Sequence, residues 1–323
     1  MNYQKSGSDM IAKGASLTDD IDCVIFDCDG VLVDVSKSYD LAIRKTTQYV
    51  LKKFAGIRSI PITAKIICSF KSTGGFNDEV DVTYASIVSL VAAKKLGTNG
   101  TKFIYRVIKN ADSTGIKSVE KFLNTLDVDL SDIRKKLDYP GNRATNPLYE
   151  IFDQIFYGPE LYKKLFKKKS QFTEKGLINN DKVILTKKLL STFEKKFGKN
   201  LAIVSGRGKE SVHYSLKGLL GRFNLKSSVF LEDEPREMAK PNPKSLLFSI
   251  SRLNAKHSLY VGDSMEDLIM AKKVARMGKK ITFCGIYGTS ENTRSKIHLF
   301  KDQGAQLIIK SINSLPKALN LAK

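Results

Sequence analysis

The stretch that decides the fold is residues 24–32, which read VIFDCDGVL. Three apolar residues of strand length lead directly into two aspartates, Asp27 and Asp29, and then into a glycine. In extended backbone, residues two apart point to the same side, so both carboxylates can face one pocket. In open α/β sheets, ligands bind at the carboxyl ends of the strands, which is where this pair stands. The stretch therefore indicates a buried strand that ends in a candidate acidic site.

Short apolar runs of the same kind recur along the chain and predict a parallel sheet. From residue 200 onward they alternate with helical patterns, which is typical of strands joined by helices that cover both faces of a sheet. Their continuous apolar character fits strands that are buried on both sides. The runs are 24–26, 201–204, 229–231, 259–261, 281–284 and 307–309. We therefore expect an α/β fold with a Rossmann-like parallel core.

The long segment between the first and second runs has little strand character and predicts a helical insertion. Helical periodicity indicates helices at 36–55, with Ser36 as the N-cap, and at 80–96, 113–126, 147–157, 159–169 and, on the return to the core, 181–197. The expected organisation is a flexible tail at 1–20, a core formed by 21–35 and 178–323, and a mostly helical cap at 36–177.

The two aspartates after the first strand also suggest a bound cation. Two carboxylates about 4 Å apart repel by about 4 kcal/mol at an effective dielectric constant near 20. A hard cation such as Mg²⁺, which prefers oxygen ligands, allows both to stay ionised. The alternative is a plain capped turn, because Asp-Gly is a common turn pair.

Three later features follow other strands and favour the cation over the turn. The second run ends in Ser205, whose hydroxyl and the following N–H groups can hold a phosphoryl oxygen. Lys240 stands between the third and fourth runs, next to a proline, and supplies a point charge for phosphate or carboxylate. The fourth run ends in Asp263 and, four residues later, Asp267. A Ser-Gly turn or a surface lysine would explain one such feature alone, but an aspartate pair, a serine, a lysine and a further aspartate after four successive strands are very unlikely by chance.

Together these residues resemble the four motifs of the haloacid dehalogenase (HAD)-like hydrolase superfamily. The motifs are Asp27-x-Asp29-Gly30, Ser205, Lys240 and Gly262-Asp263-x-x-x-Asp267. The resemblance is on the phosphatase side, near the phosphoglycolate phosphatase-like branch, and covers about 21–35 and 178–310. The helical insertion resembles the family's first-type cap but is longer than the four-helix cap common in that branch, so details carried by the cap transfer poorly.

The resemblance implies the roles of the two aspartates. Asp27 attacks phosphorus and forms an aspartyl-phosphate, and Asp29 is the general acid to the leaving alkoxide and the general base to water. Dehalogenases need no acid for a halide and typically lack the second aspartate, so Asp29 argues for phosphoryl transfer. A phosphomutase uses the same pair, and that alternative stays open.

The resemblance also implies the metal site and the phosphate site. The implied Mg²⁺ is held by the Asp27 carboxylate, the Asp29 main-chain carbonyl and Asp263, with Asp267 as a further ligand or as the residue that orients Lys240. Ser205 and Lys240 are implied to bind phosphoryl oxygens.

Further residues are candidates for substrate binding. Gly75 and Asn77 stand in a loop between two expected helices of the insertion, where a family cap loop would select the substrate; a plain interhelical turn is the alternative. Gly206 and Arg207 follow the motif serine, and Arg207 is either a substrate contact or an exposed surface arginine.

Composition narrows the class of protein. Lys and Arg total 54 against 33 Asp and Glu, a net charge of +21. We interpret this excess as a lysine-rich exterior, with nucleic acid binding as the less favoured alternative. No apolar run reaches the length of a membrane helix, the first 20 residues contain no signal-like apolar stretch, and the four cysteines show no metal-ligand spacing. We expect a cytoplasmic, Mg²⁺-dependent phosphoric monoester hydrolase acting on a small phosphorylated metabolite, with a phosphomutase or a non-catalytic binding module as alternatives.

Overall fold

The computed structural model describes residues 4–5, 10–12, 20–58, 62–76, 78–143, 145–290 and 292–321. The chain folds into two compact units. Unit 2 is Lys37–Asn180, and unit 1 is formed by the chain on either side of it. The boundaries expected from the sequence, 36 and 177, lie within three residues of these.

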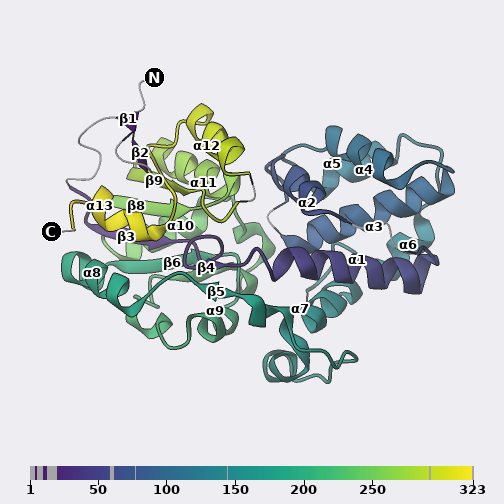
Figure 1. Ribbon diagram of the computed structural model, residues 1–323, viewed down its shortest axis with the longest axis horizontal. Coiled ribbons are helices and arrows are strands. Elements are labelled where there is room, and N and C mark those ends of the chain that lie inside the picture. Colours follow the sequence, from purple (N-terminus) through teal and green to yellow (C-terminus); the bar gives the residue numbers. More distant parts are fainter. Residues whose placement is uncertain are drawn as a thin grey trace. The chain divides into compact units, whose positions relative to one another are not determined.

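Unit 1 is built on a parallel sheet, as predicted (Figure 1). The strand order is β1-β2-β10-β9-β8-β3-β6-β7, and the six strands from β10 to β7 are parallel. Their bounds are Cys23–Phe26 (β3), Leu201–Ser205 (β6), Val229–Phe230 (β7), His257–Gly262 (β8), Lys280–Ile286 (β9) and Leu307–Ile309 (β10). All six apolar runs are therefore strands of one sheet.

The N-terminal segment differs in part from the expected loose tail. Most of residues 1–20 lies outside the described residues. Two short strands within it, β1 (Gln4–Lys5) and β2 (Met10–Ala12), are antiparallel to each other, and β2 pairs with β10. β1 and β2 thus extend the sheet at its β10 edge.

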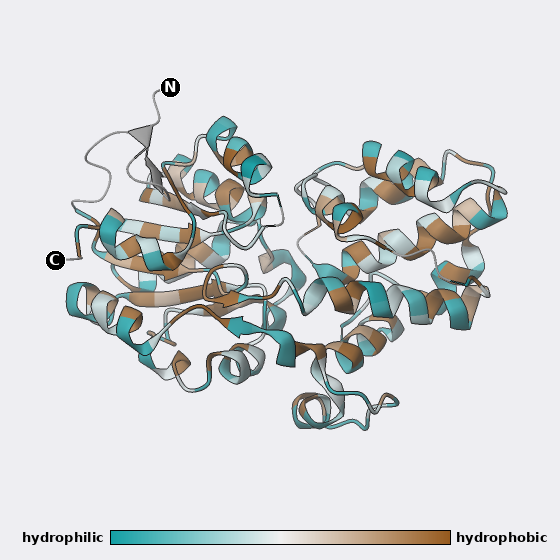
Figure 2. Cartoon of the chain, viewed as in Figure 1, coloured by the Kyte–Doolittle hydropathy of each residue, from teal (hydrophilic) through white to brown (hydrophobic). Residues whose placement is uncertain are grey.

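Helices cover both faces of this sheet, because successive strand residues point to opposite sides and both sides are apolar. In β3, Val24 and Phe26 belong to one apolar cluster, and Cys23 and Ile25 belong to the other. The first cluster contains residues of α8 (Lys187–Phe197), α9 (Lys209–Leu216) and α13 (Leu315–Ala318). The second contains residues of α10 (Lys244–Arg252), α11 (Met265–Arg276) and α12 (Thr293–Asp302). Figure 2 shows the apolar strands between helices with hydrophilic outer faces.

The two segments that connect unit 1 to unit 2 pair with each other within unit 1. β4 (Val33–Asp34) leads out of the core, β5 (Lys182–Val183) leads back, and the two are antiparallel. The Leu32 carbonyl accepts hydrogen bonds from the next two N–H groups after β5. The outgoing and returning chain therefore form one ribbon next to the Asp27–Asp29 turn.

Unit 2 is helical, which confirms the predicted helical insertion after the first strand of the parallel sheet. Its helices are α1 (Tyr39–Ala55), α2 (Ala64–Lys71), α3 (Glu79–Lys95), α4 (Gly100–Lys109), α5 (Ile116–Leu123), α6 (Ser131–Leu137) and α7 (Pro147–Phe166). Helix α3 is buried along residues 80–93 and contacts the other six helices. Helix α7 is interrupted at Gly158, next to Pro159, where the sequence predicts the break.

Three predicted helix starts need correction. Helix α1 begins at Tyr39 rather than 36, and Ser38 rather than Ser36 is at the N-cap position. The Ser36 N–H donates instead to the Asp34 side chain. The expected helices at 113–126 and 181–197 are α5 and α8, which begin three and six residues later, the second because β5 comes first. Among the described residues, no helix is long and apolar enough to cross a membrane.

Candidate active site

Asp27 follows β3 directly and is almost completely buried, with 6% of its surface exposed. Its N–H donates to the Val261 carbonyl of the neighbouring strand β8 at 2.8 Å. Its Oδ1 accepts from the Cys28 N–H at 2.7 Å. Cys28 itself is buried in the apolar core.

The turn after Asp29 is shaped by Gly30, which has φ of +71° and donates its N–H to the Val33 carbonyl. A Cβ at Gly30 would lie 2.3 Å from Oδ2 of Asp263. Only glycine allows this turn and this approach together. The turn and the end of β8 are thus brought into direct contact, with Asp27 and Asp263 on neighbouring strand ends.

Asp267 is held by a dense set of donors at the start of α11. Ser264 is the N-cap and forms a capping box with Asp267. Oδ2 of Asp267 accepts from the Ser264 hydroxyl at 2.8 Å and from the N–H groups of Asp263 and Ser264 at 3.1 Å. Oδ1 accepts from the Tyr260 hydroxyl at 2.6 Å. The side chain is completely buried, so its orientation is set by these bonds.

Lys240 lies between two of these carboxylates. Its Nζ is 2.9 Å from Oδ1 of Asp27 and 2.8 Å from Oδ1 of Asp267, and only 2% of its side chain is exposed. Burial alone would lower the pKa of Lys240, but the attraction of Asp267 and Asp27 outweighs it and raises that pKa. Lys240 is therefore a buried ammonium that offsets the charge of the acidic cluster.

The two buried aspartates respond differently to this environment. Burial, together with the repulsion of Asp267, Asp29 and Asp263, raises the pKa of Asp27 against the opposing effect of Lys240. For Asp267, burial raises the pKa, but Lys240 and the Tyr260 and Ser264 hydroxyls outweigh it and lower the pKa. The surroundings therefore favour the ionised form of Asp267, whereas Asp27 is the carboxylate that a further cation would stabilise more.

The carboxylates of Asp27, Asp263 and Asp267 each offer an oxygen within 4.8 Å of the others. This oxygen-only donor set suits Mg²⁺. The oxygens of Asp267 are already occupied by four donor groups and Lys240. Asp263 is 22% exposed and has an ion pair from Lys296 at 2.9 Å. Asp27 and Asp263 therefore fit direct metal ligands better than Asp267 does.

Ser205 ends β6 and so lies at the same edge of the sheet. Ser205 is buried, and its hydroxyl accepts from the Arg207 N–H at 3.2 Å. A Cβ at Gly206 would meet no atom within 4 Å, so there is open space beside that residue. The next two N–H groups, of Gly208 and Lys209, donate to Glu232 and Asp233. Any phosphoryl contact of this loop therefore falls on Ser205 and Gly206.

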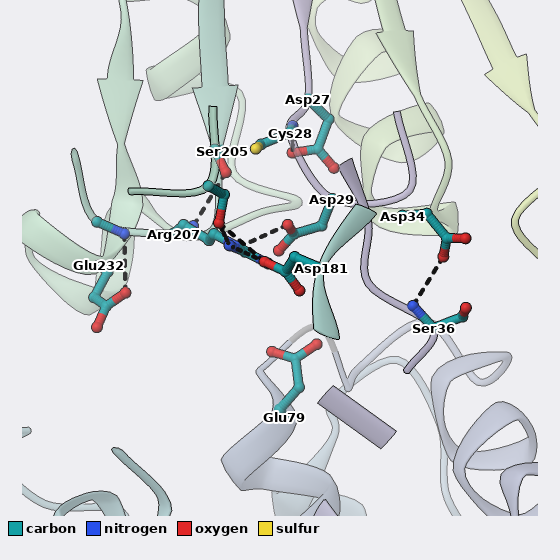
Figure 3. A network of polar contacts seen from close by, with 12 residues as sticks. Asp27, Cys28, Asp29, Asp34, Ser36, Glu79, Asp181, Ser205, Arg207 and Glu232 are labelled. Carbon is teal, nitrogen blue, oxygen red and sulfur yellow. Dashed lines mark hydrogen bonds and ion pairs between the residues drawn. The ribbon is translucent and has the colours of Figure 1, made fainter. Parts of the chain in front are cut away.

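Arg207 is completely buried, which excludes the exposed surface arginine considered from the sequence. Its Nε lies 2.7 Å from Oδ1 of Asp29, and one terminal nitrogen lies 2.8 Å from Oδ2 of Asp181 (Figure 3). The same terminal nitrogen donates to the Ser215 hydroxyl at 2.8 Å. Sequence reasoning missed Asp181, which belongs to no motif and stands just before β5.

The expected substrate residues of the insertion belong to unit 2. Gly75 lies against another loop of that unit, since a Cβ there would be 2.4 Å from the Gly115 N atom. The lack of a side chain at Gly75 therefore allows this close packing within unit 2. Asn77 lies outside the described residues.

A family model described as hydrolase, haloacid dehalogenase-like hydrolase, matches residues 21–275. The chain belongs to this family. The match spans both parts of unit 1 that hold the acidic site and the whole of unit 2. The HAD resemblance read from the four motifs is therefore confirmed.

Solved structures show the same fold. An X-ray structure of a Northeast Structural Genomics Consortium target is 20% identical, with a TM-score of 0.61 over 93% of this chain and 98% of that one. A phosphatase from Thermococcus thioreducens is 21% identical, with a TM-score of 0.56 over 87% of this chain and 99% of that one. No curated protein sequence matches the chain. At these identities the HAD-like fold is what the chain and these structures share.

Proposed function

We propose that this HAD-like hydrolase is a Mg²⁺-dependent phosphatase that acts on a small phosphorylated metabolite through an aspartyl-phosphate. The observation that carries the proposal is the position of Asp27, which contacts Lys240 at 2.9 Å and is clustered with Asp263. A buried carboxylate beside a buried ammonium and further acids suits attack on a dianionic phosphate only when cations neutralise the charge. The phosphatase from Thermococcus thioreducens, which shares this fold, supports the same proposal.

The chain's own residues account for two half-reactions. In the first, an Asp27 oxygen attacks phosphorus, the bond from phosphorus to the substrate oxygen breaks, and Asp29 donates a proton to that oxygen. In the second, Asp29 takes a proton from water, the water oxygen attacks phosphorus, and the aspartyl-phosphate bond breaks. Inorganic phosphate leaves and Asp27 is regenerated. Lys240 and the Ser205 hydroxyl bind phosphoryl oxygens and keep phosphorus in line with Asp27.

Asp27, Asp263 and the main-chain carbonyl of Asp29 would hold Mg²⁺. When bound, the ion supplies positive charge that stabilises the phosphoryl oxygens in the transition state. Asp267 acts indirectly, through Lys240, and not as a direct metal ligand. Because its oxygens accept from Tyr260, Ser264 and Lys240, its role is to orient the ammonium toward Asp27.

The substrate class follows from chemistry shared by all these residues. They contact the phosphoryl group alone, so they select a phosphate monoester and leave the rest of the molecule open. We propose that residues of unit 2, Gly75 and Asn77 among the candidates, select that remainder. A phosphomutase using the same aspartate pair is the second candidate, because Asp27 and Asp29 serve both reactions.

The test is a Mg²⁺-dependent hydrolysis screen over phosphorylated metabolites and p-nitrophenyl phosphate. Wild type is compared with Asp27→Asn and with Asp132→Asn, which changes an exposed aspartate of α6 paired with Lys136. We expect turnover that needs the metal, is abolished by the first change and is retained with the second. Turnover that survives Asp27→Asn would exclude Asp27 as the nucleophile, and an inactive wild type would favour a binding module.

A second assay separates phosphatase from mutase. The phosphoenzyme is formed with a radiolabelled phosphate donor, and the label is then followed with and without a sugar monophosphate. A phosphatase releases the label as inorganic phosphate in both cases. Transfer of the label to the sugar phosphate, with a requirement for a bisphosphate, would favour the mutase.

A further inference from the structure

Arg207 is a buried cation of the candidate site with no part in binding phosphate in the mechanism above. It stands in the loop between β6 and α9, two residues after Ser205, and none of its side chain is exposed. A fully buried guanidinium is costly unless carboxylates and hydrogen bonds compensate for lost hydration. The compensating groups are Asp29 at Nε, and Asp181 and the Ser215 hydroxyl at one terminal nitrogen.

The contact between Arg207 and Asp181 is an anchor for the guanidinium. Oδ2 of Asp181 is 2.8 Å from a terminal nitrogen of Arg207 and also accepts from the Ser215 hydroxyl at 2.9 Å. Ser215 and Arg207 both come from the β6–α9 region, and Asp181 is the first residue of unit 1 after the chain leaves unit 2. The side chain of Asp181 is only 4% exposed. Asp181 therefore holds the guanidinium at a different nitrogen from the one that contacts Asp29.

The contact with Asp29 links Arg207 to the residue that transfers protons in the proposed mechanism. The Asp29 side chain remains 25% exposed while its Oδ1 lies 2.7 Å from the guanidinium. The carboxylate is thus held by protein at Oδ1 and still faces solvent in part. Figure 3 shows the Arg207 side chain in contact with both Asp29 and Asp181, and Asp27 close to Asp29.

We infer that Arg207 is a positioning residue that holds the Asp29 carboxylate where it removes the proton from the hydrolytic water, with Asp181 as the anchor of Arg207. The inference rests on the proposed phosphatase function. Asp29 accepts the water proton, the water oxygen bonds to phosphorus, and the bond to Asp27 breaks. Arg207 touches neither phosphate nor water in this step.

A positioning role predicts a kinetic split that a purely structural role does not. With p-nitrophenyl phosphate the leaving phenolate needs little help from an acid, so kcat/KM reports attack by Asp27. If Asp29 is misplaced, hydrolysis of the aspartyl-phosphate slows and kcat falls while kcat/KM is kept. KM falls with kcat, and the phosphoenzyme accumulates.

The experiment compares wild type with Arg207→Gln, Arg207→Lys and Asp181→Asn in steady-state and rapid-quench assays. Misplacing a catalytic group typically costs about 10- to 100-fold, so we expect such a loss in kcat for Arg207→Gln. For the same variant, kcat/KM stays within about threefold, and a burst of about one nitrophenolate per enzyme precedes the slow phase. Arg207→Lys keeps the positive charge but lacks the planar guanidinium with its several donors, so its kcat should lie between those of Arg207→Gln and wild type. We expect Asp181→Asn to lower kcat less than Arg207→Gln does.

The matched control is Arg222→Gln. Arg222 is another arginine of unit 1 that pairs with a carboxylate, Glu194, and a serine, Ser191, but it is one-third exposed. We expect it to leave kcat, KM and the burst unchanged.

A double variant guards against simple unfolding. Arg207→Gln leaves two acids without their shared cation, and adding Asp181→Asn removes one of those charges. We expect the double variant to regain thermal stability but to keep the low kcat and the burst. Recovery of kcat in the double variant would show that Arg207 only neutralises Asp181, and would overturn the inference.

The remaining outcomes also decide whether Arg207 has a positioning role. An equal loss in kcat and kcat/KM, or no loss in either, overturns the positioning role while an active wild type leaves the phosphatase function standing. A wild type inactive toward every phosphate monoester overturns the proposed function and the positioning role with it.

Discussion

Gly30 and the Asp263 carboxylate occupy adjoining space, so that a single methyl group at Gly30 would lie 2.3 Å from Oδ2 of Asp263. This contact joins the turn after the first parallel strand to the end of β8. It also sets the separation between the two carboxylates that fit a metal ion best, those of Asp27 and Asp263.

We therefore expect Gly30→Ala to weaken Mg²⁺ binding and activity together. The methyl group displaces Asp263, and alanine at φ of +71° adds backbone strain of about 1–2 kcal/mol. Activity at limiting Mg²⁺ should fall at least about 10-fold, in line with the cost of disturbing metal ligation. Mg²⁺ titration of hydrolysis is the measurement.

The control for this change is Gly304→Ala. Gly304 has φ of +74° and open space around its Cβ direction, so it reproduces the strain without the contact. If both variants lose Mg²⁺ affinity equally, the Gly30–Asp263 contact has no special role.

Removing the buried ammonium should be among the most damaging single changes. Lys240→Met leaves Asp27 and Asp267 facing each other without a cation, and breaking a buried charge pair costs about 3–5 kcal/mol. We expect a large drop in urea-unfolding free energy and loss of turnover. Lys136→Met, which breaks an exposed pair on α6, should change stability by less than about 1 kcal/mol. Comparable losses in the two variants would contradict the importance of the buried pair.

The variant Tyr260→Phe tests whether Asp267 acts by orienting Lys240. The Tyr260 hydroxyl donates to Oδ1 of Asp267 at 2.6 Å, the same oxygen that contacts Lys240. Loss of a buried hydrogen bond to a charged group costs about 1.5–3 kcal/mol, so Tyr260→Phe should lower stability by that amount. It should also reduce kcat a few-fold without changing Mg²⁺ affinity. Tyr214→Phe, at a 41% exposed position, is the control. A loss of Mg²⁺ affinity in Tyr260→Phe would instead make Asp267 a metal ligand.

The opposite end of β8 carries a pH-dependent contact. Hydrogen bonds from Lys280 and His257 lower the pKa of Asp20 from 3.8 to about 2. Because the folded-state pKa is depressed, the stabilisation by Asp20 is present above pH 3.8 and is lost as pH falls toward 2. Unfolding curves of wild type and Asp20→Asn should therefore differ at pH 5 and converge as the pH is lowered. Since Asp20 is exposed, high salt should reduce the difference. A difference that grows on acidification would contradict this.

Much of the site could be predicted from the sequence because its residues stand at the ends of local patterns. Asp27, Ser205 and Asp263 each follow an apolar run, and the carboxyl ends of parallel strands meet at one edge of a sheet. The positions of helix starts could not be predicted as well. Ser36 looks like an N-cap, but its N–H bonds to Asp34 before α1 begins, and such local competition is settled by the folded backbone.

The partners of the charged groups were beyond sequence reasoning. From the sequence Arg207 is either a substrate contact or a surface residue. The structure excludes the surface residue and pairs Arg207 with Asp29 and Asp181. Asp181 stands in no motif, and its contact depends on the return of the chain beside β4. The same holds for Tyr260, which reads as one apolar residue of a strand and in fact orients Asp267.

The sequence by itself determined the α/β core, the helical insertion and the set of acids at the strand ends, because apolar periodicity and position after a strand are local properties of the chain. Only the tertiary structure decided which cation faces which acid. Burial makes that choice matter, since a charge removed from water must be balanced by the groups that folding places beside it. Here Lys240 is assigned to Asp27 and Asp267, and Arg207 to Asp29 and Asp181.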